Sequence, residues 1–304
     1  VYTADGASLH CEHCDYSSNG AQSQMIEEQD FTVGISTAAG HQHAVAMHAF
    51  QCDSCGATYM LDPQTTSLTC AHCDSVFTID QRDSVKLQPP EAIIPFASNS
   101  EQAQARAIQW LGEKGVKEID DVHIHGVFLP VWTFDVSGSL EWRCQVYDSK
   151  RETWLPRTGS KLVLFDDILI PASRPMTREL AQLIVSFDKD DLVDYDAGLT
   201  AGWMAETYQI TMSDAALDAR ALSQRRAKQL INNDIWDRHR DLYVSSTGLL
   251  IERYKLVLLP VWLGRYTNAE KPYEFFVNGN TLDCNGTLPP GGLRRIVDWI
   301  LGDD

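Results

Sequence analysis

The stretch CDSCGATYMLDPQTTSLTCAHC, residues 52–73, decides the fold of the N-terminal part of the chain. Cys52 and Cys55 are two residues apart, and Cys70 and Cys73 repeat that spacing after 14 intervening residues. This pattern is typical of a zinc ribbon, in which each cysteine pair forms a knuckle and donates two thiolates to one tetrahedral ion. The sequence therefore predicts a four-cysteine zinc site. Disulfide pairing, typical of secreted chains, is the alternative.

The residues around the knuckles indicate short strands. Gly56 tolerates the tight backbone after the first cysteine pair. Residues 58–61 and 67–69 are expected to form the two strands of one hairpin that turns at Asp62-Pro63. Residues 76–79 supply a closing strand, so the complete ribbon is expected to span residues 47–84.

Half of this motif occurs a second time at the start of the chain. Residues 8–15 match residues 67–74 at a constant offset of 59, and they contain Cys11 and Cys14. The partner knuckle would precede Val1, so residues 1–16 are interpreted as the second half of an upstream ribbon and its cysteines as zinc ligands. The alternatives are a knuckle that binds no metal, or a site completed by His41 and His43.

The charge distribution argues against a nucleic-acid-binding ribbon. The formal net charge is −17, and residues 1–83 hold eleven acidic side chains against the single basic Arg82. Nucleic-acid binding needs Lys and Arg for the phosphates, so the ribbons are predicted to be structural or to bind proteins. The densest basic run could form a hidden basic face or a solvated helix surface: Arg220, Arg225, Arg226, Lys228, Arg238 and Arg240.

Length and apolar content predict a globular chain of two or three domains. The chain has 304 residues, of which 44% are hydrophobic, and no apolar run approaches the roughly 20 residues that span a bilayer. Cys144 and Cys284 lie outside the knuckles and are expected to be small core residues. Paired cysteines without a signal peptide favour a reducing, cytoplasmic location.

A mixed α+β body is predicted to follow the ribbon. Residues 17–46 read as a polar connector with one short strand at 31–35, and Pro89-Pro90 marks the domain boundary. Ser98 and Glu101 form a capping-box pattern for a helix that ends at Gly115. A strand is expected over 122–132, with His123 and His125 on one solvated face.

The tetrapeptide Leu-Pro-Val-Trp at 129–132 returns at 259–262. Each copy follows a helical segment, the second capped by Ser213, and precedes a hairpin-like stretch, the second around Asn278-Gly279. This context predicts an internal duplication, with chance recurrence as the alternative. Each proline is expected at a bulge or sheet edge, and each tryptophan in the core.

The remaining segments carry no recognisable site. Residues 161–170 predict a strand and 177–185 a short helix, while the acidic loop 188–196 lacks the EF-hand spacing and favours helix capping over calcium binding. Residues 291–304 predict an amphipathic helix. The predicted class is therefore α+β, with N-terminal zinc ribbons followed by two helix-plus-antiparallel-sheet units at 85–185 and 186–304.

Several of these features together resemble a known family. The complete ribbon, the lead-in Ile93-Ile94-Pro95-Phe96 and both Leu-Pro-Val-Trp strands are similar to those of bacterial transcription-factor-IIB-type zinc-ribbon proteins. Members are often labelled primosomal protein N′ or replication-restart helicase. The resemblance implies two N-terminal ribbons and genes that neighbour those of phage-shock-protein-A-like and SPFH membrane proteins. It thus implies an adaptor in membrane-stress assemblies at the inner membrane face.

The helicase label finds no support in the residues. The sequence contains no P-loop, HExxH motif, nucleophile elbow or dinucleotide fingerprint. A non-catalytic zinc-binding adaptor is therefore expected, with phage-shock-protein-A-like or SPFH proteins as implied partners. The alternative is a nucleic-acid-associated ribbon protein of transcription or replication.

Overall fold

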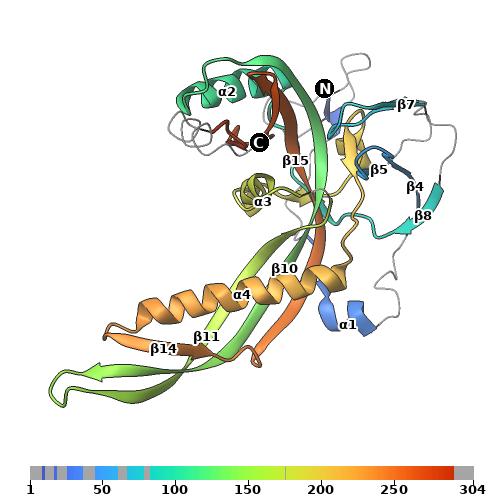
Figure 1. The fold of residues 1–304 in the computed structure, drawn as a ribbon. Helices are drawn as coiled ribbons and strands as arrows, with labels where there is room; N and C mark the ends of the chain where they lie inside the picture. Colours follow the sequence, from blue (N-terminus) through green and yellow to red (C-terminus); the bar gives the residue numbers. More distant parts are fainter. Residues whose placement is uncertain are drawn as a thin grey trace.

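The fold is α+β and is built on two long antiparallel strands, β10 (Asp120–Asp148) and β15 (Leu249–Asn268) (Figure 1). The computed structural model describes residues 9–10, 17–18, 26–36, 45–60, 67–78, 83–174 and 176–290. Both strands contain a continuous apolar run that is buried on both faces, as is typical of strands covered from two sides. Leu129 and Leu259, from the two repeated tetrapeptides, lie opposite each other in this ladder.

The two prolines of the tetrapeptides lie inside these central strands, so the predicted sheet-edge or bulge position is wrong. The Pro130 carbonyl accepts a hydrogen bond from Ala172 N at 3.0 Å, and the Pro260 carbonyl accepts one from Gly279 N at 2.8 Å. Because the N–H and C=O of one residue point to the same side of an antiparallel strand, the missing N–H also faces outward. On that side of β10, the short parallel strand β13 ends just before Pro130, and the antiparallel strand β11 starts to pair just after it. On that side of β15, the parallel strand β9 and the antiparallel strand β16 are arranged in the same way around Pro260.

Two runs of elements have matching contacts around this ladder. Strand β9 (Ala92–Ile93) and helix α2 (Ser100–Glu113) precede β10, while β13 (Met204–Glu206) and α4 (Met212–Asp234) precede β15. Both tryptophans are buried, as predicted, and each donates a hydrogen bond to the segment before the other run's helix. Trp262 Nε1 donates to Ser98 Oγ at 3.0 Å, and Trp132 Nε1 to the Ile210 carbonyl at 2.8 Å. These contacts favour the internal duplication, which stays a prediction.

Helices α2 and α4 begin at different residues than predicted. In α2 the capping box is formed by Asn99, whose side chain accepts from Gln102 N at 2.9 Å, while the Gln102 side chain accepts from Asn99 N at 3.0 Å. Ser98 cannot cap, because its hydroxyl bonds the Gly279 carbonyl and accepts from Trp262. Similarly, Thr211 rather than Ser213 caps α4. Gly115 adopts a φ of +82° just after α2, as a helix-ending glycine should.

Beyond the ladder, β10 continues with β11 (Thr153–Pro171) and β14 (His239–Val244) into a projecting sheet covered on one face by α4 (Figure 1). The strand predicted at 122–132 and the one at 161–170 are parts of β10 and β11. We call residues 136–165 and 217–250 the arm. It extends away from α2 and from the zinc ribbon (Figure 1).

The remaining elements complete the other end. Strand β16 (Lys271–Asn278) pairs with β15 and with β17 (Cys284–Gly286), so the hairpin is confirmed, although its second strand starts later than expected. Helix α3 (Arg178–Ile184) confirms the helix predicted over 177–185. The acidic loop forms two short 3₁₀ turns, Lys189–Asp191 and Ala197–Thr200, capped by Asp188 and Asp196, on either side of β12 (Val193–Asp194). In the described ranges, no helix combines the length and apolarity needed to cross a bilayer.

Three ribbon strands, β4, β5 and β8, belong to the same large sheet as the body, whereas β6 and β7 form a two-stranded sheet of their own. Strands β4 (Val45–Gln51) and β5 (Thr58–Met60) flank the first knuckle, β6 (Ser67–Thr69) and β7 (Val76–Thr78) flank the second, and β8 (Asp83–Leu87) pairs with β4. The predicted pairing of 58–61 with 67–69 is wrong, because each knuckle closes its own hairpin. Strand β5 instead pairs with β13 of the body.

The connector also differs from its prediction. Residues 31–35 lie in a helix, α1 (Phe31–Ser36), after β3 (Gln29–Asp30), because the Asp30 carboxylate accepts a hydrogen bond from Val33 N at 2.9 Å. Phe31 packs edge-on against Phe134 and Tyr254, whereas Val33 and Ile35 are exposed. The Asp62-Pro63 turn and the C-terminal amphipathic helix at 291–304 lie outside the described residues.

Candidate metal centre

The two knuckles have the same backbone geometry. In the first, Cys52 N donates to the Ala57 carbonyl and Gly56 N to the Cys52 carbonyl. In the second, the equivalent bonds run from Cys70 N to Ser75 and from Asp74 N to Cys70. The residue after each second cysteine has a positive φ, +81° at Gly56 and +58° at Asp74. The sequence predicted this conformation for the glycine but not for the aspartate, which is among the residues that tolerate it best.

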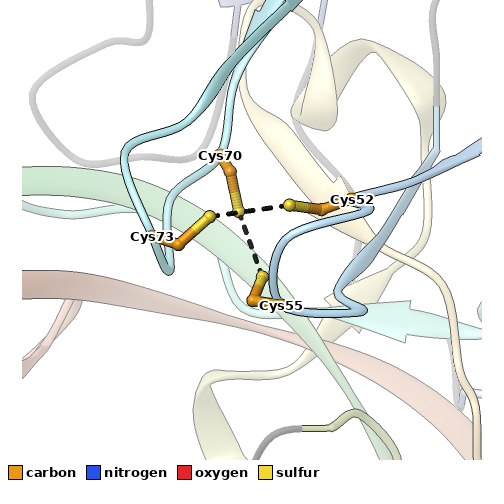
Figure 2. A group of neighbouring side chains, drawn as sticks. All are labelled: Cys52, Cys55, Cys70 and Cys73. Atoms are coloured by element: carbon orange, nitrogen blue, oxygen red, sulfur yellow. Dashed lines mark hydrogen bonds between the residues drawn. The ribbon is translucent and has the colours of Figure 1, made fainter.

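The four thiols converge on one point, as Figure 2 shows. Cys52 Sγ lies 3.5 Å from Cys73 Sγ, Cys55 Sγ lies 3.5 Å from Cys70 Sγ, and all four sulfurs are within 4.8 Å of one another. Tetrahedral zinc with bonds of about 2.3 Å requires sulfur separations of about 3.8 Å. The predicted ligands thus come together as one group, and their geometry fits a four-thiolate metal ion.

The electrostatics of the thiols also fit a cation. Burial raises the pKa of Cys55 and Cys70. For Cys73, burial opposes ionisation, but hydrogen bonds with Ser75 outweigh it and lower the pKa to about 6. Thiolates packed this closely repel one another unless a metal neutralises them, so metal binding would displace protons.

One half of the cluster is buried in the protein core, and Cys55 and Cys73 are partly exposed. Cys52 and Cys70 are fully buried in the same apolar cluster as Val127, Leu129 and Val261 of the central strands. The hydroxyl of buried Tyr59 lies 3.2 Å from Cys70 Sγ and accepts a hydrogen bond from the Ala71 N–H. Four cysteines with no open position are typical of a structural zinc site, in which the metal stabilises the fold.

Polar contacts tie the second knuckle to the body. His72 Nε2 lies 2.5 Å from Oε1 of buried Glu206 on β13. Burial would lower the pKa of His72, but the hydrogen bond and charge of Glu206 raise it. Asp74 bonds His125 Nε2 at 2.8 Å and lies 3.4 Å from an Arg265 nitrogen. The face of His125, predicted to be solvated, therefore helps to hold the ribbon.

Sequence reasoning missed these contact residues. Tyr59, His72 and Asp74 lie next to the ligands in the chain, whereas Glu206 comes from a segment for which no element was predicted. A lone Glu206 between Ala205 and Thr207 carries a weak signal for a buried ion pair. Its partner His72, inside the Cys-x-x-Cys pair, gives no sign of where it points.

The predicted ligands Cys11 and Cys14 lie outside the described residues, as do His41 and His43. The strands on either side of Cys11 and Cys14 are β1 (Leu9–His10) and β2 (Ser17–Ser18). They pair in the same register as β6 and β7 once the offset of 59 is applied. This backbone match favours a second knuckle, and the metal site there stays a prediction.

A second group of carboxylates does not fit a metal ion. The carboxylates of Glu28, Asp135 and Asp167 lie within 4.8 Å of one another. The Lys255 ammonium already occupies this group, 2.9 Å from Glu28 and 2.8 Å from Asp167. Burial raises the pKa of Asp135 to about 6. We interpret the group as an ion-pair cluster that attaches residues 26–36 to β15.

The comparisons with known proteins give little beyond this geometry. No protein-family model matches the chain, and no solved structure matches it. The chain is similar to YdjG, an uncharacterised protein of Bacillus subtilis (strain 168), at 23% identity over 238 residues. The match covers 70% of this chain and 67% of the relative. It is a distant likeness that assigns no activity.

Proposed function

We propose that this chain is a non-catalytic zinc-binding adaptor that binds protein partners in a membrane-associated or stress-related assembly. The observation that carries the proposal is the four-cysteine cluster where ribbon and body meet, with Cys52 and Cys70 buried in the core and Cys55 and Cys73 partly buried. A metal enclosed there stabilises the fold and offers no open position to a substrate. The ribbon would then serve as a rigid platform.

The charge of the ribbon region supports protein partners over nucleic acid. Residues 1–83 contain eleven acidic side chains and one basic side chain, and four thiolates on a zinc ion add further negative charge. The finer parts of the proposal come from the family resemblance alone. They are a cytoplasmic position at the inner membrane face and partners of the phage-shock-protein-A-like or SPFH type.

One observation favours the alternative of a nucleic-acid-associated protein. Arg225, Lys228 and Arg238 of the arm are exposed, and none of them forms an ion pair within the described part of the chain. This cationic surface is the one that a nucleic acid would use.

The test is affinity purification of the full-length protein from its own cells in mild detergent, with mass spectrometry and an absorbance measurement for nucleic acid. Val76→Asp changes an exposed ribbon residue, and Ile108→Asp, exposed on α2, is the matched control. We expect membrane-associated scaffold proteins, lost with Val76→Asp and kept with Ile108→Asp. Recovery of polymerase or replication proteins with nucleic acid would overturn the proposal.

A further inference from the structure

The face of the arm opposite α4 carries exposed apolar and cationic side chains. We call it the outer arm face and define it by Leu162, Leu164, Leu250, Tyr243, Arg143 and Arg240. The three leucines are 77%, 74% and 63% exposed. Isolated exposed leucines are common, but a contiguous group on a sheet face indicates an interaction surface.

The strand register brings the leucines together. Ser137 of β10 pairs with Leu164 on one side and with Leu250 on the other, so the three side chains lie in one row across the sheet. Leu162 lies two residues from Leu164 on the same face, opposite Ser139. The serines between the leucines are small, and Ser137 donates a hydrogen bond to the Glu252 carboxylate beside the row.

Cations and aromatic rings occupy the same face closer to the tip. The Arg143 guanidinium lies 4.9 Å from the centre of the Tyr243 ring, and that of Arg240 lies 4.3 Å from the Trp154 ring. Trp236, at the end of α4 beside this tip, is 96% exposed. Trp and Tyr side chains are enriched at the boundary between water and lipid headgroups.

The arm differs in charge from the rest of the chain. It holds 11 Lys and Arg against 7 Asp and Glu, a net charge of +4, while the remaining 14 basic and 35 acidic residues give −21. Four of these cations belong to α4 on the opposite face, so the charge describes the arm as a whole, which points away from the ribbon and can approach an anionic surface while the more acidic part stays remote (Figure 1).

We propose that the outer arm face binds an anionic lipid surface. The leucines enter the boundary between headgroups and acyl chains, and Arg143 and Arg240 bind headgroup phosphates. A nucleic acid would use the arginines but leave the leucines in water, so lipid accounts for both. The inference rests on the proposed membrane-associated function and adds its lipid partner.

The test is co-sedimentation of the full-length, zinc-loaded protein with vesicles of phosphatidylcholine alone or mixed with phosphatidylglycerol. One variant combines Leu162→Ser with Leu164→Ser, and another combines Arg143→Gln with Arg240→Gln. The control combines Ile108→Ser on α2 with Lys114→Gln just after it, both exposed and away from the arm. Circular dichroism checks that each variant is folded.

We expect binding to the mixed vesicles only, weakened by salt. The arginine variant should bind about thirtyfold more weakly and the leucine variant about tenfold more weakly, with the control unchanged. Equal binding to both vesicle types, no binding, or variants that match the control would overturn the proposal. The proposal would also be overturned if light scattering showed a dimer that the leucine substitutions dissociate. A salt-sensitive complex with DNA, formed in place of lipid binding, would overturn it as well. If the protein partners are recovered from cells but vesicle binding fails, this inference is overturned and the proposed function stands.

Discussion

Glu91 provides a quantitative test of the packing between the lead-in segment and β15. Its Oε1 accepts a hydrogen bond from Gln88 Nε2 and its Oε2 accepts one from Leu256 N, both at 2.6 Å. Burial nevertheless raises the pKa of this carboxyl from 4.5 to about 7. Ionised Glu91 is therefore less stable in the folded chain than in the unfolded chain.

The sign of the pH effect follows from these two values. Both states are protonated well below pH 4.5, so the contribution of Glu91 to stability is fully present there. It is lost as the pH rises through the folded pKa of about 7. Between pH 5 and pH 8, Glu91 should lower the free energy of unfolding by about 2.5 kcal/mol.

Glu91→Gln removes the titration and keeps the shape, because its carbonyl oxygen can accept from Leu256 N while Gln88 rotates its amide. We would measure urea unfolding at pH 5 and pH 8 with zinc present, using exposed Glu101→Gln as the control. From pH 5 to pH 8, the free energy of unfolding of the variant should fall by about 2.5 kcal/mol less than that of the wild type. Equal losses in wild type and Glu91→Gln would refute the reasoning.

Three further predictions concern the core and the metal centre. Leu129→Ala, in the middle of the buried ladder, should lower the free energy of urea unfolding by about 2–5 kcal/mol, whereas exposed Leu164→Ala should change it by less than about 0.5 kcal/mol; similar losses would contradict this. Glu206→Gln removes the ionic partner of His72 and should cost about 1–3 kcal/mol, with faster hydrogen exchange in the second knuckle; unchanged exchange would count against the contact. Zinc affinity, measured by chelator competition, should fall more steeply below pH 6, where Cys73 takes up a proton, and a constant slope would argue against this.

The metal ligands could be predicted because their signal is local. Two residues between Cys52 and Cys55 restrict both sulfurs to one turn, and the same holds for Cys70 and Cys73. The apolar runs around the two Leu-Pro-Val-Trp copies likewise indicated buried strands. Neither inference needed to know which distant segment would pack against which.

The contacts that depend on distant segments could not be predicted. The hydroxyl of Ser98 matches a helix cap in sequence, but it bonds Gly279 and Trp262, more than 160 residues away, and Asn99 caps instead. Pro130 and Pro260 suggested sheet edges, because sequence cannot show that the neighbouring strand changes beside each of them. The pairing of β5 with β13 is non-local in the same way.

The most direct test of the central claim, that a buried four-cysteine zinc ion joins ribbon and body, is native mass spectrometry of the purified full-length chain and of Cys70→Ser. The wild type should retain a zinc ion that the variant has lost, and the variant should also lose hydrogen-exchange protection in both β5 and β13. A wild-type chain with no bound metal, or a variant that keeps full protection in these two strands, would contradict the account.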